Sequence, residues 1–132
     1  MVAGATSDDV EGVDVIVKRA FDADADDVRA SDAVVLGTPE NFGYMSGALK
    51  DFLERIYYVL VDETPGYPYA LYVKASTDGS GAVRSVERIV AGLKWRAVLP
   101  PLVVTGSIED PHLEAAHELG LTLAAGLEAG IF

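Results

Sequence analysis

Four short apolar runs alternate with amphipathic stretches along the chain. The runs are rich in β-branched residues and cover Val13–Val17, Ala33–Leu36, Tyr69–Val73 and Leu102–Thr105. The second and fourth runs are continuously apolar, which is the pattern of parallel strands covered on both faces. The pattern therefore predicts four strands of a parallel sheet.

Helices are predicted after the last three of these runs. Apolar residues recur there at helical spacing, within Leu49–Leu60, Val83–Leu93 and Leu113–Leu127. Ser46 is placed to cap the first helix, and Asp110 with Pro111 to begin the third. A weaker helical turn is predicted over Asp24–Ala30, and Met1–Thr6 is typical of a helix end. The order βαβαβαβα predicts an α/β fold with right-handed crossovers, in one domain spanning residues 1–132.

Three segments that follow predicted strands are candidates for ligand binding: Gly37–Gly47, Lys74–Gly81 and Thr105–Ser107. Open α/β sheets bind ligands outside the carboxyl ends of their strands. The first segment is 11 residues long and holds three glycines and two aromatic residues. Such connections usually have about 2–6 residues. We therefore predict that this segment is a binding loop.

Composition narrows the class of protein. Half of the residues are apolar and 23% are charged, so the chain can bury a core and is not disordered. No apolar run approaches the ~18 residues of a membrane span, and the start lacks a signal-peptide pattern. We expect a cytoplasmic protein. The chain has no cysteine, which excludes thiol nucleophiles, disulfides and iron–sulfur clusters.

Charge argues against nucleic-acid binding, and residue spacing argues against metal binding. The net charge of −11 disfavours nucleic acid, whose binding requires clustered Lys and Arg. Asp22, Asp24 and Asp26 match the first ligand positions of an EF-hand, but Asp27 stands where its glycine is required. His112 and His117 are five residues apart and would point to different helix faces, so we expect solvated or capping histidines. No metal site is predicted.

The clustered tyrosines allow more than one interpretation. They are Tyr57, Tyr58, Tyr67, Tyr69 and Tyr72. Packing within the fold is favoured. A substrate mouth or a contact between subunits of a homo-oligomer are the alternatives.

The 19 residues from Gly37 to Arg55, GTPENFGYMSGALKDFLER, resemble the flavodoxin-like NAD(P)H-dependent flavin reductases and quinone reductases. The resemblance extends from about Val13 to Phe132. It implies a flavodoxin-like fold, with a doubly wound parallel sheet in a three-layer αβα arrangement. It also implies FMN as the cofactor and NAD(P)H as the reductant.

The resemblance also implies which residues hold the cofactor. The first segment would surround the isoalloxazine ring with Thr38, Pro39, Glu40, Asn41, Phe42 and Gly43. The second would lie beside the dimethylbenzene or ribityl part with Ala75, Ser76, Thr77 and Gly79. Glycine lets backbone amides approach the polar edge of the ring closely. No catalytic side chain is expected, because the flavin carries the chemistry.

The implied function is hydride transfer from NAD(P)H through the flavin to a quinone or a similar small-molecule acceptor. Glu40 and Asn41 differ from the Thr-Arg pair often found in the quinone-reductase branch, so the acceptor and the nicotinamide stay open. One alternative is a flavodoxin-type electron carrier, whose acidity suits docking to basic partners. The other is a non-enzymatic remnant that no longer holds FMN.

One expected part of the family fold has no counterpart in the sequence. Flavodoxin-like proteins begin with a strand and a Ser/Thr/Gly-rich loop that binds the FMN phosphate at a helix N-terminus. Only 12 residues precede Val13, whereas a βαβ unit takes about 30. We therefore expect the first strand and the phosphate loop to be absent from these 132 residues. Val13–Val17 and Ala33–Leu36 would then have unpaired edges, unless the strands pair differently or a partner chain supplies a strand.

Overall fold

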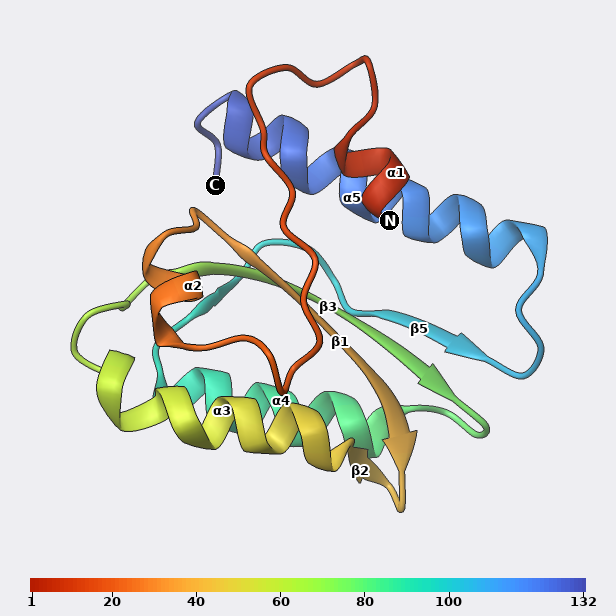
Figure 1. Cartoon of the computed structure of the whole chain (residues 1–132). Helices are drawn as coiled ribbons and strands as arrows, with labels where there is room; N and C mark the ends of the chain where they lie inside the picture. Colours follow the sequence, from red (N-terminus) through yellow and green to blue (C-terminus); the bar gives the residue numbers. More distant parts are fainter. The chain divides into compact units, whose positions relative to one another are not determined.

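A computed structural model describes residues 1–132 (Figure 1). These residues form two compact units. The larger unit is Lys18–Gly106, and the smaller consists of Met1–Val17 together with Ser107–Phe132. A single domain over the whole chain stays a prediction. The larger unit contains the sheet and the first two of the three segments that the sequence singles out for ligand binding. The third segment, Thr105–Ser107, is divided between the two units, since Ser107 belongs to the smaller one.

Three parallel strands form the centre of the larger unit. β3 (Pro68–Ala75) pairs with β1 (Val34–Asn41) on one side and with β5 (Leu102–Thr105) on the other. The short β4 (Arg96–Ala97) pairs with the first residues of β3, and β2 (Tyr44–Met45) runs antiparallel to the end of β1. Three of the four predicted strands are thus confirmed, and β1 and β3 extend beyond their predicted ends.

The core of this unit lies between the sheet and two helices, α3 (Gly47–Leu60) and α4 (Ser80–Gly92), which cover the same face (Figure 1). Its fully buried side chains come from both helices and from β3, and they include Leu53, Ile56, Val86, Val90 and Leu71. Burying each such side chain stabilises the fold by about 1.5–3 kcal/mol. Ser46 caps α3 as predicted, because its side chain accepts a hydrogen bond from the Leu49 N–H.

The predicted strand Val13–Val17 is wrong. This segment pairs with no strand, and Ile16 and Val17 are each 70% exposed. β-branched residues favour extended backbone, but a strand also requires a neighbour to satisfy its N–H and C=O groups. In the larger unit, the edge of β1 that faces away from β3 pairs only through Glu40 and Asn41, with β2.

The smaller unit holds two helices, α1 (Val2–Ala5) and α5 (Asp110–Glu128), which pack together. The segment Met1–Thr6 is helical over Val2–Ala5, and its interpretation as the end of a longer helix stays a prediction. The cap of α5 is Glu109, one residue before the predicted position, and Pro111 lies in the first turn. The Glu109 N–H donates to His112 Nδ1 at 3.1 Å, which confirms a capping role for that histidine. None of the helices is long and apolar enough to cross a bilayer.

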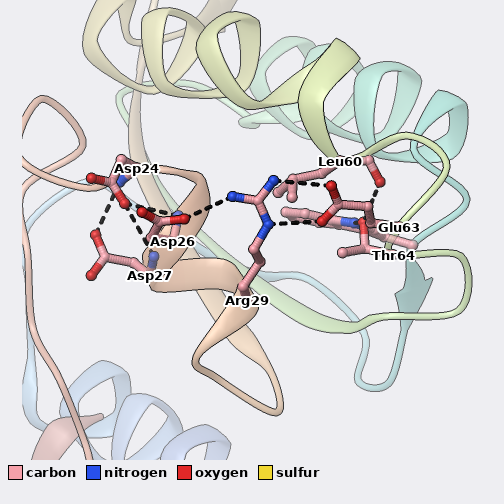
Figure 2. Close-up of polar contacts among 8 residues, drawn as sticks. Asp24, Asp26, Asp27, Arg29, Leu60, Glu63 and Thr64 are labelled. Atoms are coloured by element: carbon pink, nitrogen blue, oxygen red, sulfur yellow. Dashed lines mark hydrogen bonds and ion pairs between the residues drawn. The ribbon is translucent and has the colours of Figure 1, made fainter.

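The aspartates that resemble a calcium loop instead begin α2 (Ala25–Arg29), which confirms the predicted helical turn. The Asp24 carboxylate accepts hydrogen bonds from the N–H groups of Asp26 and Asp27, as Figure 2 shows. Asp27 accepts one in return from the Asp24 N–H at 3.0 Å. This reciprocal capping satisfies backbone donors that a helix N-terminus would otherwise leave free.

Arg29 ties α2 to the segment that follows α3 (Figure 2). Its guanidinium donates to Asp26 on its own helix and to both carboxylate oxygens of Glu63, at 2.7 and 3.0 Å. The hydrogen bonds from Arg29 hold the pKa of Glu63 below its usual value. The three groups are solvent-accessible, so the pairs fix geometry more than they add stability.

A shallow cavity of about 370 Å³ lies beside this ion pair, at the amino ends of the strands. Tyr67 lines it, and its hydroxyl is buried without a hydrogen-bond partner. Nearby, Trp95 Nε1 donates to Thr64 Oγ1 at 2.8 Å, and this hydroxyl donates to the Leu60 carbonyl. The packing of Tyr67 on Trp95 and these hydrogen bonds therefore hold the amino end of the sheet together beside the cavity.

Replacing Tyr67 with phenylalanine should stabilise the fold, most of all at alkaline pH. Burial, followed by the Asp32 carboxylate, raises the pKa of Tyr67 to about 12, and the adjacent Ser31 offsets part of the rise. Because the folded pKa exceeds the unfolded one, the stabilisation by neutral Tyr67 is complete below pH ~10 and is lost as pH rises toward 12. Tyr67→Phe removes both this titration and an unpaired hydroxyl, for a gain of about 1 kcal/mol at pH 7.

Thermal unfolding at pH 7 and pH ~11 measures this effect, with the exposed Tyr58→Phe as the control. We expect the advantage of Tyr67→Phe to grow with pH. A loss of stability at pH 7, or an unchanged pH profile, would contradict this account.

Candidate functional site

The register of the sheet brings the ends of β1, β3 and β5 to one edge. Pro39 is opposite Lys74, and Ala75 is opposite Thr105. Because the three strands are parallel, the segments that follow them all leave from this carboxyl edge. The structure thus places the first two predicted binding segments, Gly37–Gly47 and Lys74–Gly81, side by side.

The first of these segments is a β-hairpin and not the predicted 11-residue loop. β1 continues through Asn41, and Phe42 and Gly43 form a two-residue turn into β2. Both turn residues have positive φ, 54° and 66°, as in a type I′ turn. Glycine adopts this conformation at little cost, whereas phenylalanine rarely does. In the sequence, only Gly43 indicated this turn, because glycine is the residue that most easily adopts positive φ.

The hairpin exposes some of the predicted site residues and buries another. Phe42 is fully exposed at the tip, and Pro39, Asn41 and Gly43 are also exposed. Thr38 is buried, and its hydroxyl accepts from the Ser46 N–H at 2.9 Å and donates to the Pro39 carbonyl. Its side chain therefore supports the hairpin from within and does not face solvent.

Glu40 connects the two predicted segments. Its Oε1 accepts from the Thr77 hydroxyl at 3.3 Å, and its Oε2 accepts from the Ala82 N–H at 3.1 Å. Ala82 lies in the first turn of α4, where a carboxylate interacts favourably with the free amides and the helix dipole. One side chain of the hairpin thus holds both the loop after β3 and the start of the next helix.

The hairpin also packs directly against α4. The Met45 N–H donates to Ser85 Oγ at 3.0 Å, and this buried hydroxyl donates to the Ala82 carbonyl at 2.8 Å. A Cβ on Gly81 would lie 2.0 Å from the Gly43 carbonyl oxygen, so only glycine permits this approach. The sequence analysis did not identify Ser85. The available signal was its position among the apolar residues on the buried face of α4.

The loop after β3 presents polar groups beside the hairpin. Ser76 and Thr77 are exposed, and their backbone N–H groups donate to no acceptor in the chain. Asp78 accepts from the Ser80 N–H at 2.9 Å, which lowers the pKa of Asp78. Gly79 caps α4 with a φ of 72°. Ala75 and Gly79 are buried, so only Ser76 and Thr77 among the four predicted residues of this segment present side chains to a ligand.

These groups suit a flat ligand with a polar edge. Exposed Phe42 offers an aromatic plane, and the free N–H groups of Ser76 and Thr77 offer donors. The structure brings together no group of three or more histidine or acidic side chains that could bind a metal ion. The edge can therefore bind a planar heterocycle whose rim carries hydrogen-bond acceptors.

Replacing Ser85 with alanine should loosen the hairpin. Alanine favours helix more than serine does, yet the variant leaves the buried Met45 N–H without an acceptor. We expect a loss of about 1–3 kcal/mol in the free energy of unfolding, measured by urea denaturation. Ser107→Ala, at an exposed serine outside the helices and strands, serves as the control. A Ser85→Ala protein as stable as the control would contradict the assigned contact.

Comparison with solved structures shows the fold. A flavodoxin from an archaeon superposes with a TM-score of 0.65 at 15% identity, covering 80% of this chain and 72% of that one. A flavodoxin from Streptococcus pneumoniae TIGR4 gives 0.68 at 24% identity, over 86% and 79%. A WrbA-like flavodoxin from Agrobacterium tumefaciens gives 0.65 at 15% identity, over 74% and 67%. The predicted α/β, flavodoxin-like fold class is confirmed.

Comparison with protein families identifies the chain more closely. No protein of curated function matches the sequence. A family model does match, over residues 7–110, which include the hairpin, the loop after β3 and all strands of the sheet. That model describes NADPH-dependent FMN reductases, and the chain belongs to this family.

Proposed function

We propose that this chain binds FMN at the carboxyl edge of the sheet and uses NAD(P)H to reduce it. The observation that carries the proposal is the Glu40 bridge, which holds an exposed aromatic hairpin tip beside a loop with free backbone donors. The description of the matching family names both FMN and NADPH, which supports the choice of cofactor and reductant.

The residues around the ring would divide the binding between them. The Phe42 side chain would contact a face of the ring, and Asn41 and Gly43 would lie near its rim. The free N–H groups of Ser76 and Thr77 would donate to ring acceptors. Thr38, Pro39, Glu40, Ala75 and Gly79 would shape the two segments from behind. Bound FMN supplies the hydride chemistry, and the protein supplies position and electrostatics.

We propose a quinone or a similar small flat molecule as the final acceptor. With Phe42 assigned to the flavin, Tyr44 still leaves apolar surface exposed at the hairpin, at 42% of its full area. A planar acceptor can use such surface by stacking, which contributes about 0.5–1.5 kcal/mol for an aromatic pair. This acceptor class is the one expected from the sequence.

An electron carrier is the second candidate function. The net charge of −11 and the likeness to flavodoxin structures favour it, since an acidic surface attracts basic redox partners. A carrier would bind FMN but would not oxidise NADPH in repeated cycles. A remnant without function would bind no flavin.

Two measurements separate these functions. FMN is titrated into the purified protein and its fluorescence quenching followed, and NADPH oxidation is then assayed with and without a benzoquinone. We expect saturable binding of one FMN per chain and NADPH oxidation that accelerates with the quinone. Binding without NADPH oxidation would favour the carrier, and no binding would contradict the proposal.

Replacing Phe42 with alanine should weaken FMN binding without harming the fold. The side chain is fully exposed, so the protein loses no packing, and a stacked ring is worth about 1–3 kcal/mol. We therefore expect Kd to rise about 5- to 100-fold, measured by the same titration. Tyr58→Ala, which removes another exposed aromatic ring from α3, is the matched control. Equal affinities for the two variants would show that Phe42 does not contact the cofactor.

A further inference from the structure

Glu40 carries an unbalanced charge at the proposed FMN site. It is half-buried near the end of β1, and it forms no ion pair with any lysine, arginine or histidine. Its carboxylate is instead held by a hydroxyl and a backbone amide, from Thr77 and Ala82. These two hydrogen bonds, one to each carboxylate oxygen, fix the side chain to the loop after β3 and to the first turn of α4. The negative charge therefore has a fixed place beside the groups assigned to the ring.

We infer that Glu40 is a positioning residue with two effects: it holds the loop after β3 in its binding conformation, and its charge lowers the reduction potential of bound FMN. The inference rests on the proposed function. Two-electron reduction places negative charge on the flavin ring, and a fixed carboxylate nearby opposes that charge. A lower potential makes the reduced cofactor a stronger donor to its acceptor.

Glutamine at this position separates the two effects. The Glu40→Gln side chain can still accept from the Ala82 N–H through its oxygen, and its amide nitrogen can donate to Thr77 Oγ1. Both contacts survive while the charge is lost. Glu40→Ala loses the charge and both contacts. Asp62 is an exposed acidic residue beyond the end of α3, and Asp62→Asn is the control for a general loss of negative charge.

The first readout uses the protein without cofactor. Hydrogen exchange of the Ala82 amide reports directly on its bond to the Glu40 carboxylate. We expect exchange at Ala82 to accelerate at least tenfold in Glu40→Ala and to stay within about twofold of the parent in Glu40→Gln. Equal exchange in the parent and Glu40→Ala would overturn the positioning role.

The second readout is the midpoint potential of the FMN-loaded protein, measured by equilibration with a dye of known potential. In Glu40→Gln we expect the equilibrium to shift at least tenfold toward reduced FMN, which is about 30 mV for two electrons. Asp62→Asn should leave the potential unchanged. A Glu40→Gln protein that binds FMN normally but keeps the parent potential would overturn the electrostatic role while leaving the proposed function intact. A parent protein that binds no FMN would overturn both, and the exchange data would then decide only how Glu40 supports the fold.

Discussion

The parallel pairing of β3 with both β1 and β5 is the constraint on which the rest of the structure depends. It places Pro39 opposite Lys74 and Ala75 opposite Thr105, so that three chain segments leave the sheet together. A shift of one residue would turn every side chain of a strand to the other face. Leu36 and Thr38 would then leave the covered face, and the contacts that hold the hairpin would be lost.

The two ends of the larger unit are stabilised in different ways. At the amino end, Trp95 packs against Tyr67 and bonds to Thr64, and Arg29 pairs with Glu63. At the carboxyl end, the hairpin is held through Glu40 and Ser85, while its tip stays exposed. Segments with few buried contacts are those that can adjust to a ligand. The carboxyl end therefore combines a fixed base with accessible groups, as a cofactor site requires.

Sequence patterns predicted those elements whose signal is local. The apolar spacing of α3 and α4, the Ser46 cap and the strand Leu102–Thr105 are all confirmed. The prediction of a strand at Val13–Val17 failed because β-branched residues indicate a preference for extended backbone but not the presence of a neighbouring strand. The hairpin was missed because its turn places Phe42 at positive φ, which side-chain preferences disfavour.

The sequence pointed to the residues of the candidate site but not to their contacts. The resemblance at Gly37–Arg55 singled out the segment that forms the hairpin, and its role in binding FMN stays a prediction. It did not reveal that Glu40 bonds to Ala82, because the two residues are 42 positions apart and meet only through the sheet register. Nor did it reveal that Thr38 and Ala75 are buried. Such contacts depend on tertiary packing, which a single sequence does not display.

The most direct test of the account is where FMN binds on the fold. Backbone amide chemical shifts recorded during an FMN titration locate the ligand residue by residue. The account predicts that the largest changes fall on Asn41–Tyr44 and Ser76–Gly79, at the carboxyl edge of the sheet. Largest changes around Arg29, Glu63 and Tyr67, which line the cavity at the opposite end, would contradict it.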